Sequence, residues 1–430
     1  MTDQSADERI PRAELERLQL DRLRQVARRV FEHVAFYRER FRQQGVDPSD
    51  IRSLADLTRL PFTTKTDFRD TYPFGLLATP MEDVIRIHAS SGTTGKPTVV
   101  AYTRRDIDTW SELMARTLRT GGVGPADIVQ NALGYGLFTG GLGFHYGAER
   151  IGATVIPIAT GLTDRQLLAL QDFGSTVLCS TPSYALHLAD ALAAAEIASA
   201  DLKLRLGFFG AEPWTEEMRV AIESRLGLTA FNVYGLSEVI GPGVAVDCPE
   251  QRGMHVFEDH FLAEIVDPET LQPVPPGVTG ELVLTTLTKE ALPVIRYRTR
   301  DLTALLPGSC PCGRTFARIG RLTGRTDDML VIRGVNVFPS QIEHALMQVP
   351  RAEPHYLLVV RREHALDTLE VRVEAHADVA TGGEPAMRDL AAEVCHRVRE
   401  VVGITTEVTV VPPGTIERST GKAKRVLDLR

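Results

Sequence analysis

The spacing of apolar positions along the chain indicates a long helical segment near its start. Leu23, Val26, Val30 and Val34 recur at steps of three and four residues, and Arg, Glu and Gln occupy many of the positions between them. This spacing gives a single apolar stripe along one face, so residues 12–45 are expected to be helical.

The middle of the chain alternates short apolar runs with helical patterns. Strands are expected at residues 154–158, 176–179, 204–209 and 230–233, and helices at residues 184–198 and 215–226. This alternation predicts an α/β sheet with helical crossovers. Because Pro157 has no N–H to donate, the strand that contains it should lie at a sheet edge or end there.

The pattern changes twice more toward the C-terminus. Residues 260–306 combine strands with turns, which predicts a small β subdomain. After a polar break at residues 324–328, strands are expected at 329–332, 356–360, 369–373 and 406–411, and helices at 340–349 and 385–402. The predicted class is α/β, with a large N-terminal domain at residues 1–326 and a small α+β C-terminal domain at residues 327–430.

Composition excludes several classes of protein. The 430 residues exceed what one core usually carries, which favours two domains. A net charge of −8 argues against a nucleic-acid or anionic-membrane partner. The first residues are polar and acidic, unlike a signal peptide, and no apolar run approaches the ~20 residues that span a bilayer. Five cysteines are too few for a disulfide framework, so we expect a cytoplasmic enzyme.

A loop rich in Ser, Thr and Gly lies between two expected strands at residues 84–88 and 98–102. Its sequence is Ser90-Ser91-Gly92-Thr93-Thr94-Gly95-Lys96-Pro97. Such a loop can present backbone N–H groups and hydroxyls to a polyphosphate, although an ordinary turn would also fit. A Walker-type loop needs four residues before its Gly-Lys pair and a hydroxyl after it, and this sequence has two residues and a proline.

SSGTTGKP resembles the phosphate loop of the acyl-adenylate-forming enzymes, and further segments match that family in the same order. The resemblance implies nucleotide contacts for Lys65, Lys96 and the rest of the loop. Tyr234-Gly235-Leu236-Ser237-Glu238 follows an expected strand. In the family the matching aromatic residue lies against adenine and the matching Glu coordinates Mg²⁺, which implies these roles for Tyr234 and Glu238.

Three later segments extend the resemblance. In Tyr297-Arg298-Thr299-Arg300-Asp301, the family role of binding the ribose hydroxyls falls on Asp301, although Arg300 replaces the Gly of many relatives. Gly324-Arg325-Thr326-Asp327-Asp328 matches the interdomain hinge, which implies a nucleotide contact for Arg325 and a pivot at Asp327. Arg333 and Gly334 belong to a segment that turns toward the site in relatives. Lys422 matches the lysine that reaches the α-phosphate and the carboxylate, although a solvated basic tail is the alternative.

Within the superfamily, three segments resemble the phenylacetate–CoA ligase family. They are GYGLFTGG from Gly134, GAEPW from Gly210 and RGVNVFPSQ from Arg333. The resemblance implies nucleotide contacts for Gly210, Ala211, Glu212, Pro213 and Gly235. It also implies an aryl-acid pocket formed by Tyr135, Phe138, Gly140, Gly141, Ala211, Ile240, Gly241 and Pro242. Flat aromatic walls amid glycines suit a small planar acid, although both rings could instead be ordinary core residues.

A separate set of thiols and an imidazole could bind a metal ion. Cys248, His255, Cys310 and Cys312 supply four ligands of the kind found in structural zinc sites. His260 could replace His255, and reduced cysteines without a metal are the alternative.

The expected activity is that of an AMP-forming aryl-acid–CoA ligase acting on phenylacetate, with ATP, Mg²⁺ and CoA, and the resemblance implies a homodimer. A ligase for benzoate, anthranilate or a hydroxylated aryl acid remains open, as does an enzyme that loads a carrier-protein thiol. Outside enzymes, the alternatives are a nucleotide-binding regulator and a scaffold protein.

Overall fold

The computed structural model describes residues 7–90, 97–332, 335–363, 366–418 and 423–430. The chain divides into two compact units. The first contains residues 1–180, 201–211 and 229–320, and the second contains residues 181–200, 212–228 and 321–430. Two helices from the middle of the chain thus group with the C-terminal residues, and the boundary expected at residue 326 stays a prediction.

A nine-stranded mixed sheet forms the centre of the first unit. In spatial order its strands are β13 (Leu305–Leu306), β14 (Arg318–Ile319), β9 (Met254–Val256), β8 (Gly241–Asp247), β7 (Thr229–Leu236), β6 (Leu206–Gly210), β5 (Val177–Ser180), β3 (Ile128–Asn131) and β4 (Thr154–Ile156). The five strands from β7 to β4 are parallel, and the other four pair antiparallel. The α/β alternation predicted for this part of the chain is confirmed.

Burial along the parallel strands explains their sequences. All four residues of β5 are buried, as expected for a strand covered on both faces. Strand β4 lies at the edge of the sheet and ends at Ile156, one residue before Pro157. The edge position predicted from that proline is therefore confirmed.

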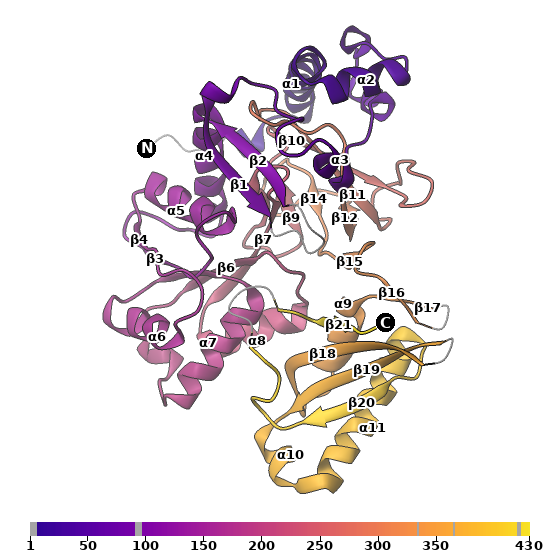
Figure 1. Cartoon of the computed structure of the whole chain (residues 1–430). Helices are drawn as coiled ribbons and strands as arrows, with labels where there is room; N and C mark the ends of the chain where they lie inside the picture. Colours follow the sequence, from indigo (N-terminus) through magenta and orange to yellow (C-terminus); the bar gives the residue numbers. More distant parts are fainter. Residues whose placement is uncertain (1–6, 91–96, 333–334, 364–365, 419–422) are drawn as a thin grey trace. The chain divides into compact units, whose positions relative to one another are not determined.

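Helices and a two-stranded hairpin complete the first unit (Figure 1). The helices are α1 (Arg12–His33), α2 (Ala35–Gln43), α3 (Lys65–Asp70), α4 (Arg104–Thr120), α5 (Gly140–Ile151) and α6 (Thr163–Asp172). The hairpin pairs β1 (Val84–Ser90) with β2 (Thr98–Thr103) on either side of the Ser/Thr/Gly loop. The single helix expected at residues 12–45 is interrupted at Val34, which has extended backbone and is buried together with Tyr37. Tertiary burial, rather than Gly or Pro, ends the first helix.

The predicted small β subdomain forms a second antiparallel sheet in the same unit. It contains β10 (Phe261–Val266), β11 (Gly280–Thr286) and β12 (Tyr297–Thr303). The apolar pattern of residues 302–305 predicts a separate strand, but these residues form the end of β12 and the start of β13. The charged residues of β12 concealed its start, because Arg298 faces away from the core and pairs with Glu281.

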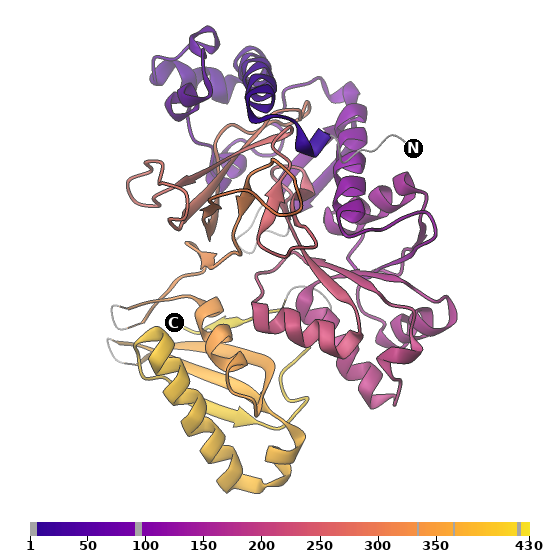
Figure 2. The same ribbon diagram turned by 180° about the vertical axis from the view of Figure 1, so that it is seen from behind.

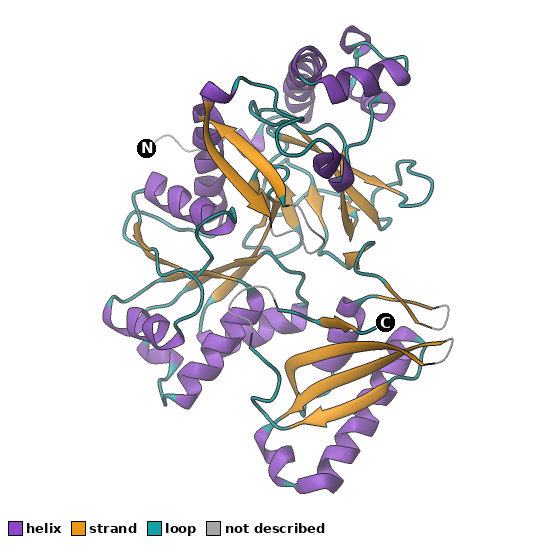
Figure 3. Ribbon diagram, viewed as in Figure 1, coloured by secondary structure: helices purple, strands orange, loops and turns teal. Residues whose placement is uncertain are grey.

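The second unit contains a four-stranded sheet with helices on one face (Figures 2 and 3). Its strands in spatial order are β20 (Glu407–Val411), β19 (Leu366–Ala375), β18 (Ala352–Glu363) and β21 (Val426–Asp428). The unit also contains a hairpin in which β16 (Leu330–Ile332) pairs with β17 (Val335–Val337). Strand β15 (Gly324–Arg325) precedes this hairpin and is not part of it. The helices of the unit are α7 (Pro182–Ala194), α8 (Glu216–Leu226), α9 (Pro339–Met347), α10 (Ala377–Thr381) and α11 (Gly383–Val402).

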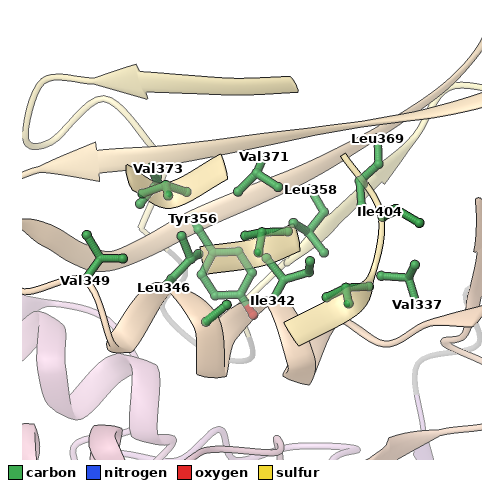
Figure 4. Close-up of a cluster of buried hydrophobic side chains, with 14 of the residues drawn as sticks. Val337, Ile342, Leu346, Val349, Tyr356, Leu358, Leu369, Val371, Val373 and Ile404 are labelled. Carbon is green, nitrogen blue, oxygen red and sulfur yellow. The ribbon is translucent and has the colours of Figure 1, made fainter. Parts of the chain in front are cut away.

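Apolar side chains from α9, α11 and the sheet form the core of this unit (Figure 4). Ile342 and Leu346 of α9 face Leu358 and Val371 of the sheet, and all four are essentially inaccessible to solvent. Burying one such side chain contributes about 1.5–3 kcal/mol. The apolar stripe predicted at residues 385–402 supplies Leu390 and its neighbours on α11 to the same core.

Within the described ranges, no helix combines the length and the apolar character that crossing a bilayer requires.

Candidate active site

The carboxyl end of β7 carries the first group of predicted site residues. Ligands of open α/β sheets bind at this end of the strands. The hydroxyl of Tyr234 donates a 2.6 Å hydrogen bond to Oδ2 of Asp301 on β12. The two residues are only 7% and 4% exposed. The structure therefore brings together the residues predicted to lie against adenine and to bind the ribose.

The turn after β7 places Glu238 beside a lysine from the N-terminal part of the chain. Nζ of Lys65, the first residue of α3, lies 3.8 Å from Oε1 of Glu238. Glu238 is buried, whereas Lys65 is partly exposed. A buried carboxylate next to a site for phosphate groups fits Mg²⁺, which prefers hard oxygen ligands and takes others from the substrate.

Lys289 is a charged residue near this turn that the sequence pattern did not single out. Its ammonium lies 4.3 Å from the ring centroid of Tyr102, whose hydroxyl donates to the backbone oxygen of Ile240. Burial lowers the pKa of Lys289 to about 8, while the carboxylates of Asp106 and Glu238 act in the opposite direction. No local motif marks such a residue, because its environment is assembled from β2, α4 and the turn after β7.

The end of β6 carries the segment that begins at Gly210. A Cβ atom on Gly210 would lie 2.2 Å from the backbone oxygen of Val233, so only glycine fits there. The next residue, Ala211, has a left-handed φ of 72°. The carboxylate of Glu212 accepts hydrogen bonds from the backbone N–H groups of Ser183 (2.7 Å) and Ala423 (2.8 Å).

Arg300, at which the family resemblance implies a glycine, has a backbone conformation that favours glycine. Its φ is 69°, in the left-handed region that costs a non-glycine residue about 1–2 kcal/mol. The buried carboxylate of Glu281 accepts its backbone N–H at 3.3 Å and lies 3.8 Å from its guanidinium. The Glu281 contacts offset part of the conformational cost at Arg300.

The predicted aryl-acid pocket draws on a glycine-rich segment that leads into α5. The side-chain amide of Asn131 donates to the hydroxyl of Tyr135 and to the backbone oxygen of Gly141, both at 2.7 Å. A Cβ on Gly140 would lie 2.6 Å from the ring of Phe138, so this glycine makes room for the aromatic ring. Both Tyr135 and Phe138 are partly exposed, unlike the fully buried core ring of Phe208.

A second predicted pocket segment, Ile240 to Pro242, contacts the first through shared neighbours. The hydroxyls of Thr139 and Ser237 lie 3.0 Å apart. A Cβ on Gly241 would lie 2.7 Å from Trp110 and 3.1 Å from Thr139. The indole of Trp110 donates to the backbone oxygen of Pro242 at 2.9 Å. The two segments predicted to wall the pocket are therefore adjacent.

The predicted hinge residues pair with each other in the second unit. The guanidinium of Arg325 donates to both carboxylate oxygens of Asp327, at 3.0 and 3.1 Å. Other predicted site residues lie outside the described residues, namely Ser91, Gly92, Thr93, Thr94, Gly95, Lys96, Arg333, Gly334 and Lys422.

The four predicted metal ligands converge in the first unit. One ligand atom from each of Cys248, His255, Cys310 and Cys312 lies within 4.8 Å of all the others. The Nδ1 atom of His255 lies 3.1 Å from the backbone oxygen of Phe316, which directs Nε2 toward the thiols, 3.4 Å from Sγ of Cys312. Burial lowers the pKa of His255 to about 4, so its imidazole is neutral, as a metal ligand must be.

The alternative ligand His260 does not belong to this cluster. Its Nδ1 atom lies 2.7 Å from the hydroxyl of Thr288, and its Nε2 lies 3.3 Å from a carboxylate oxygen of Asp259. The donor set of three thiols and one imidazole suits Zn²⁺. Cys248 and His255 come from two separate positions in the chain, and Cys310 and Cys312 form a Cys-x-Cys pair.

Comparison with known proteins identifies the family of this chain. The family of AMP-binding enzymes matches residues 26–287, and the AMP-binding enzyme C-terminal domain matches residues 334–430. The phenylacetate-coenzyme A ligase of Escherichia coli (strain K12) is 53% identical over 97% of this chain and 95% of its own length. That of Thermus thermophilus is 49% identical over 98% of both chains.

A solved structure has the same fold over almost the whole chain. A 2-hydroxyisobutyryl-CoA ligase in the postadenylation state superposes with a TM-score of 0.93 at 32% sequence identity, covering 98% of this chain and 91% of that one. The fold class predicted from the sequence is thus confirmed. From these matches and the residues gathered at the ends of β6 and β7, we conclude that the chain belongs to the phenylacetate–coenzyme A ligase family of AMP-binding enzymes.

Proposed function

We propose that this protein activates phenylacetate with ATP and transfers the acyl group to CoA, giving phenylacetyl-CoA, AMP and pyrophosphate. Identity of about one half to phenylacetate-coenzyme A ligases, along nearly the full length of both chains, is the observation that carries the proposal. The contact between Tyr234 and Asp301 supports it, because that contact prepares a nucleotide site at the end of the sheet where ligands bind.

The reaction divides into two half-reactions. In the first, a carboxylate oxygen of the acid forms a bond to the α-phosphorus of ATP, and the bond to pyrophosphate breaks. In the second, the sulfur of CoA attacks the acyl carbon, AMP leaves, and the thiol proton is released to solvent or base. Neither half-reaction needs a redox partner, and both require neutralisation of charge at phosphorus or at the leaving group.

Seven of the predicted site residues have a specific role in this proposal. Tyr234 lies against adenine, Asp301 accepts hydrogen bonds from the ribose, and Lys65 and Lys96 neutralise phosphate charge. Glu238 would hold Mg²⁺, which supplies charge neutralisation at the phosphates when bound. Lys422 orients the carboxylate toward the α-phosphate, and Asp327 is the pivot for the later half-reaction.

The aryl acid would bind between the glycine-rich segment and the residues after Glu238. Tyr135 is oriented by Asn131, and Phe138 packs against Gly140, so two rings stand where small residues leave space. Aromatic rings favour offset or edge-to-face contacts with another ring, which a phenyl group provides.

Zn²⁺ at Cys248, His255, Cys310 and Cys312 is the second part of the proposal. The cluster joins the end of β8, strand β9 and the loop between β13 and β14, so a bound ion would crosslink three segments of the nine-stranded sheet. A closed site of four protein ligands is structural, and no catalytic step passes through it.

Substrate choice is tested by assaying CoA-dependent AMP release with a panel of phenylacetate, benzoate, anthranilate and 2-hydroxyisobutyrate. We expect the highest kcat/KM for phenylacetate, because the relatives that are about half identical over nearly the full chain are phenylacetate-coenzyme A ligases. A higher value for any other acid would overturn the substrate assignment while leaving the adenylate chemistry intact. Absence of AMP release with every acid would overturn the activity itself.

Replacing Phe138 with Ala should raise the KM for phenylacetate by at least about fivefold, since an aromatic contact is worth about 1 kcal/mol beyond its buried area. The KM for ATP should change by less than about twofold. Phe173→Ala serves as the matched control, because this ring is 56% exposed on the surface. An unchanged phenylacetate KM in Phe138→Ala would place the ring outside the pocket.

Lys422→Ala should slow formation of the acyl-adenylate by about a hundredfold or more, the usual cost of one preorganised charge donor. Conversion of synthetic phenylacetyl-adenylate and CoA to thioester should stay near the wild-type rate. Rapid-quench assays of each half-reaction make the comparison, with Lys424→Ala as a control in the same basic tail. Equal losses in both half-reactions would contradict the proposed movement about Asp327.

Purified protein should contain about one zinc ion per chain, and Cys312→Ser should lower both the zinc content and the melting temperature. Cys395→Ser removes a cysteine that lies outside the cluster and should change neither value. Elemental analysis and thermal unfolding provide the measurements. Wild-type protein that is free of metal and equally stable in chelator would rule out the zinc site.

A further inference from the structure

The chain before the predicted catalytic lysine is fixed by one buried carboxylate. Glu374 lies near the end of β19, and its side chain is 0% exposed. It accepts backbone N–H groups from Gly414 (2.9 Å) and Ile416 (2.7 Å) in the segment that follows β20. Both of its oxygens also accept from the guanidinium of Arg418, at 2.8 and 2.7 Å. Four donors from five consecutive residues therefore converge on a single side chain.

A second carboxylate fixes the chain on the other side of this lysine. Glu212 accepts the backbone N–H of Ala423 at 2.8 Å and that of Ser183, in the first turn of α7, at 2.7 Å. Two residues further on, Arg425 lies over the ring of Tyr356 at 4.3 Å, and its backbone oxygen accepts from Leu358 at 2.8 Å. The tail is thus held from residue 423 into strand β21.

These two anchors bound a very short stretch of chain. Arg418 and Ala423 are five positions apart, and Lys422 immediately precedes the anchored Ala423. Lys422 itself lies outside the described residues. Ordering each residue of a flexible tail costs about 1–2 kcal/mol in backbone entropy, so a lysine on an unanchored tail would lose much of its effect on a reacting group.

We propose that Glu374 and Glu212 are positioning residues that fix the two ends of the segment carrying Lys422. The inference rests on the role of Lys422 in the proposed function. Neither carboxylate needs to touch ATP or the acid for this role. Their contribution is to the geometry of the tail, because both bind backbone N–H groups whose positions set where the intervening residues can reach.

Another buried carboxylate on the same strand provides a matched control. Glu370 lies four residues before Glu374 on β19 and is 6% exposed. It accepts from Arg361 and Arg372, each at 2.6 Å, and from Thr409 at 2.9 Å. None of these three partners belongs to the tail after residue 411. A loss of stability common to both positions can therefore be separated from an effect on the tail.

The first test compares Glu374→Gln with Glu370→Gln in the two half-reactions. The amide keeps the size of the side chain but turns an N–H₂ group toward donors that need an acceptor. Glu374→Gln should slow adenylate formation at least tenfold and leave thioester formation from synthetic adenylate within twofold. Glu370→Gln should leave both rates within twofold. Equal losses in both half-reactions, or the same pattern in both variants, would overturn the proposal.

The second test asks whether Glu374 acts through Lys422. In the Lys422→Ala background, Glu374→Gln should slow adenylate formation by less than twofold, because a positioning residue has nothing left to position. A full additional tenfold loss would overturn the proposal. If Lys422→Ala alone formed the adenylate as fast as wild type, the proposed role of Lys422 would be wrong. The inference about Glu374 and Glu212 would then lose its basis.

Hydrogen exchange, which does not depend on activity, distinguishes a local loosening of the tail from poor folding of the variant. Amide hydrogen exchange of peptides from residues 412–418 should be at least tenfold faster in Glu374→Gln, with no change in peptides from α11. Glu212→Gln alters the second anchor, at a residue also predicted to contact the nucleotide, and should give a smaller loss of adenylate formation. Unchanged exchange in Glu374→Gln, or an equal rise throughout the unit, would contradict a local anchoring role.

Discussion

The hydrogen bond from Tyr234 to Asp301 is the constraint on which the first unit depends. It joins the end of β7 in the nine-stranded sheet to β12 in the second sheet, and both partners are buried. A hydrogen bond to a buried carboxylate is costly to break, so this contact favours the arrangement in which the two sheets meet at Asp301. Two residues that are predicted to contact the nucleotide thus lie side by side although they come from separate sheets.

Buried carboxylates that bind backbone N–H groups recur through the protein. Asp106, at the start of α4, accepts the N–H groups of Glu290 (2.7 Å) and Ala291 (2.9 Å), which follow Lys289. The Asp106 contacts fix the backbone on which the buried ammonium of Lys289 is carried. Glu212 and Glu374 likewise accept backbone N–H groups of the C-terminal tail. Asp106 and Glu374 lie on regular elements, whereas Glu212 lies in the bend between β6 and α8, and each carboxylate accepts backbone N–H groups from outside its own element.

The sequence predicts elements well where apolar positions follow one period, as in the parallel strands and in α11. It fails where charge hides the pattern, as in β12, whose outward positions are arginines paired with Glu281. Strand β21 was missed for a related reason, because Val426–Asp428 is short and lies in a basic tail. Such a strand exists only because β18 offers a partner, and no local signal reports that partner.

Prediction of the site residues from the sequence succeeded and failed for similar reasons. Tyr234 and Asp301 could be predicted because they belong to segments that resemble known family motifs. The Cys/His set could be predicted because thiols and imidazoles are the usual ligands of zinc. The choice between His255 and His260 needed coordinates, since both are near enough in sequence to Cys248. Lys289 and Glu374 were missed because an isolated Lys or Glu in a strand or loop reads as a solvated residue until its burial is known.

The two anchors of the tail differ in how easily they can be opened. Glu374 is fully buried with four donors, and removing them would leave an unpaired buried charge at a cost of about 3–5 kcal/mol. Glu212 is only partly buried, so water can replace the N–H of Ala423 at a net cost of about 1 kcal/mol. The first contact is therefore suited to persist throughout the reaction cycle, and the second is suited to form and break. The proposed action of Lys422 in only one half-reaction is compatible with this combination, because the contact at Glu212 can be exchanged while the contacts at Glu374 are kept.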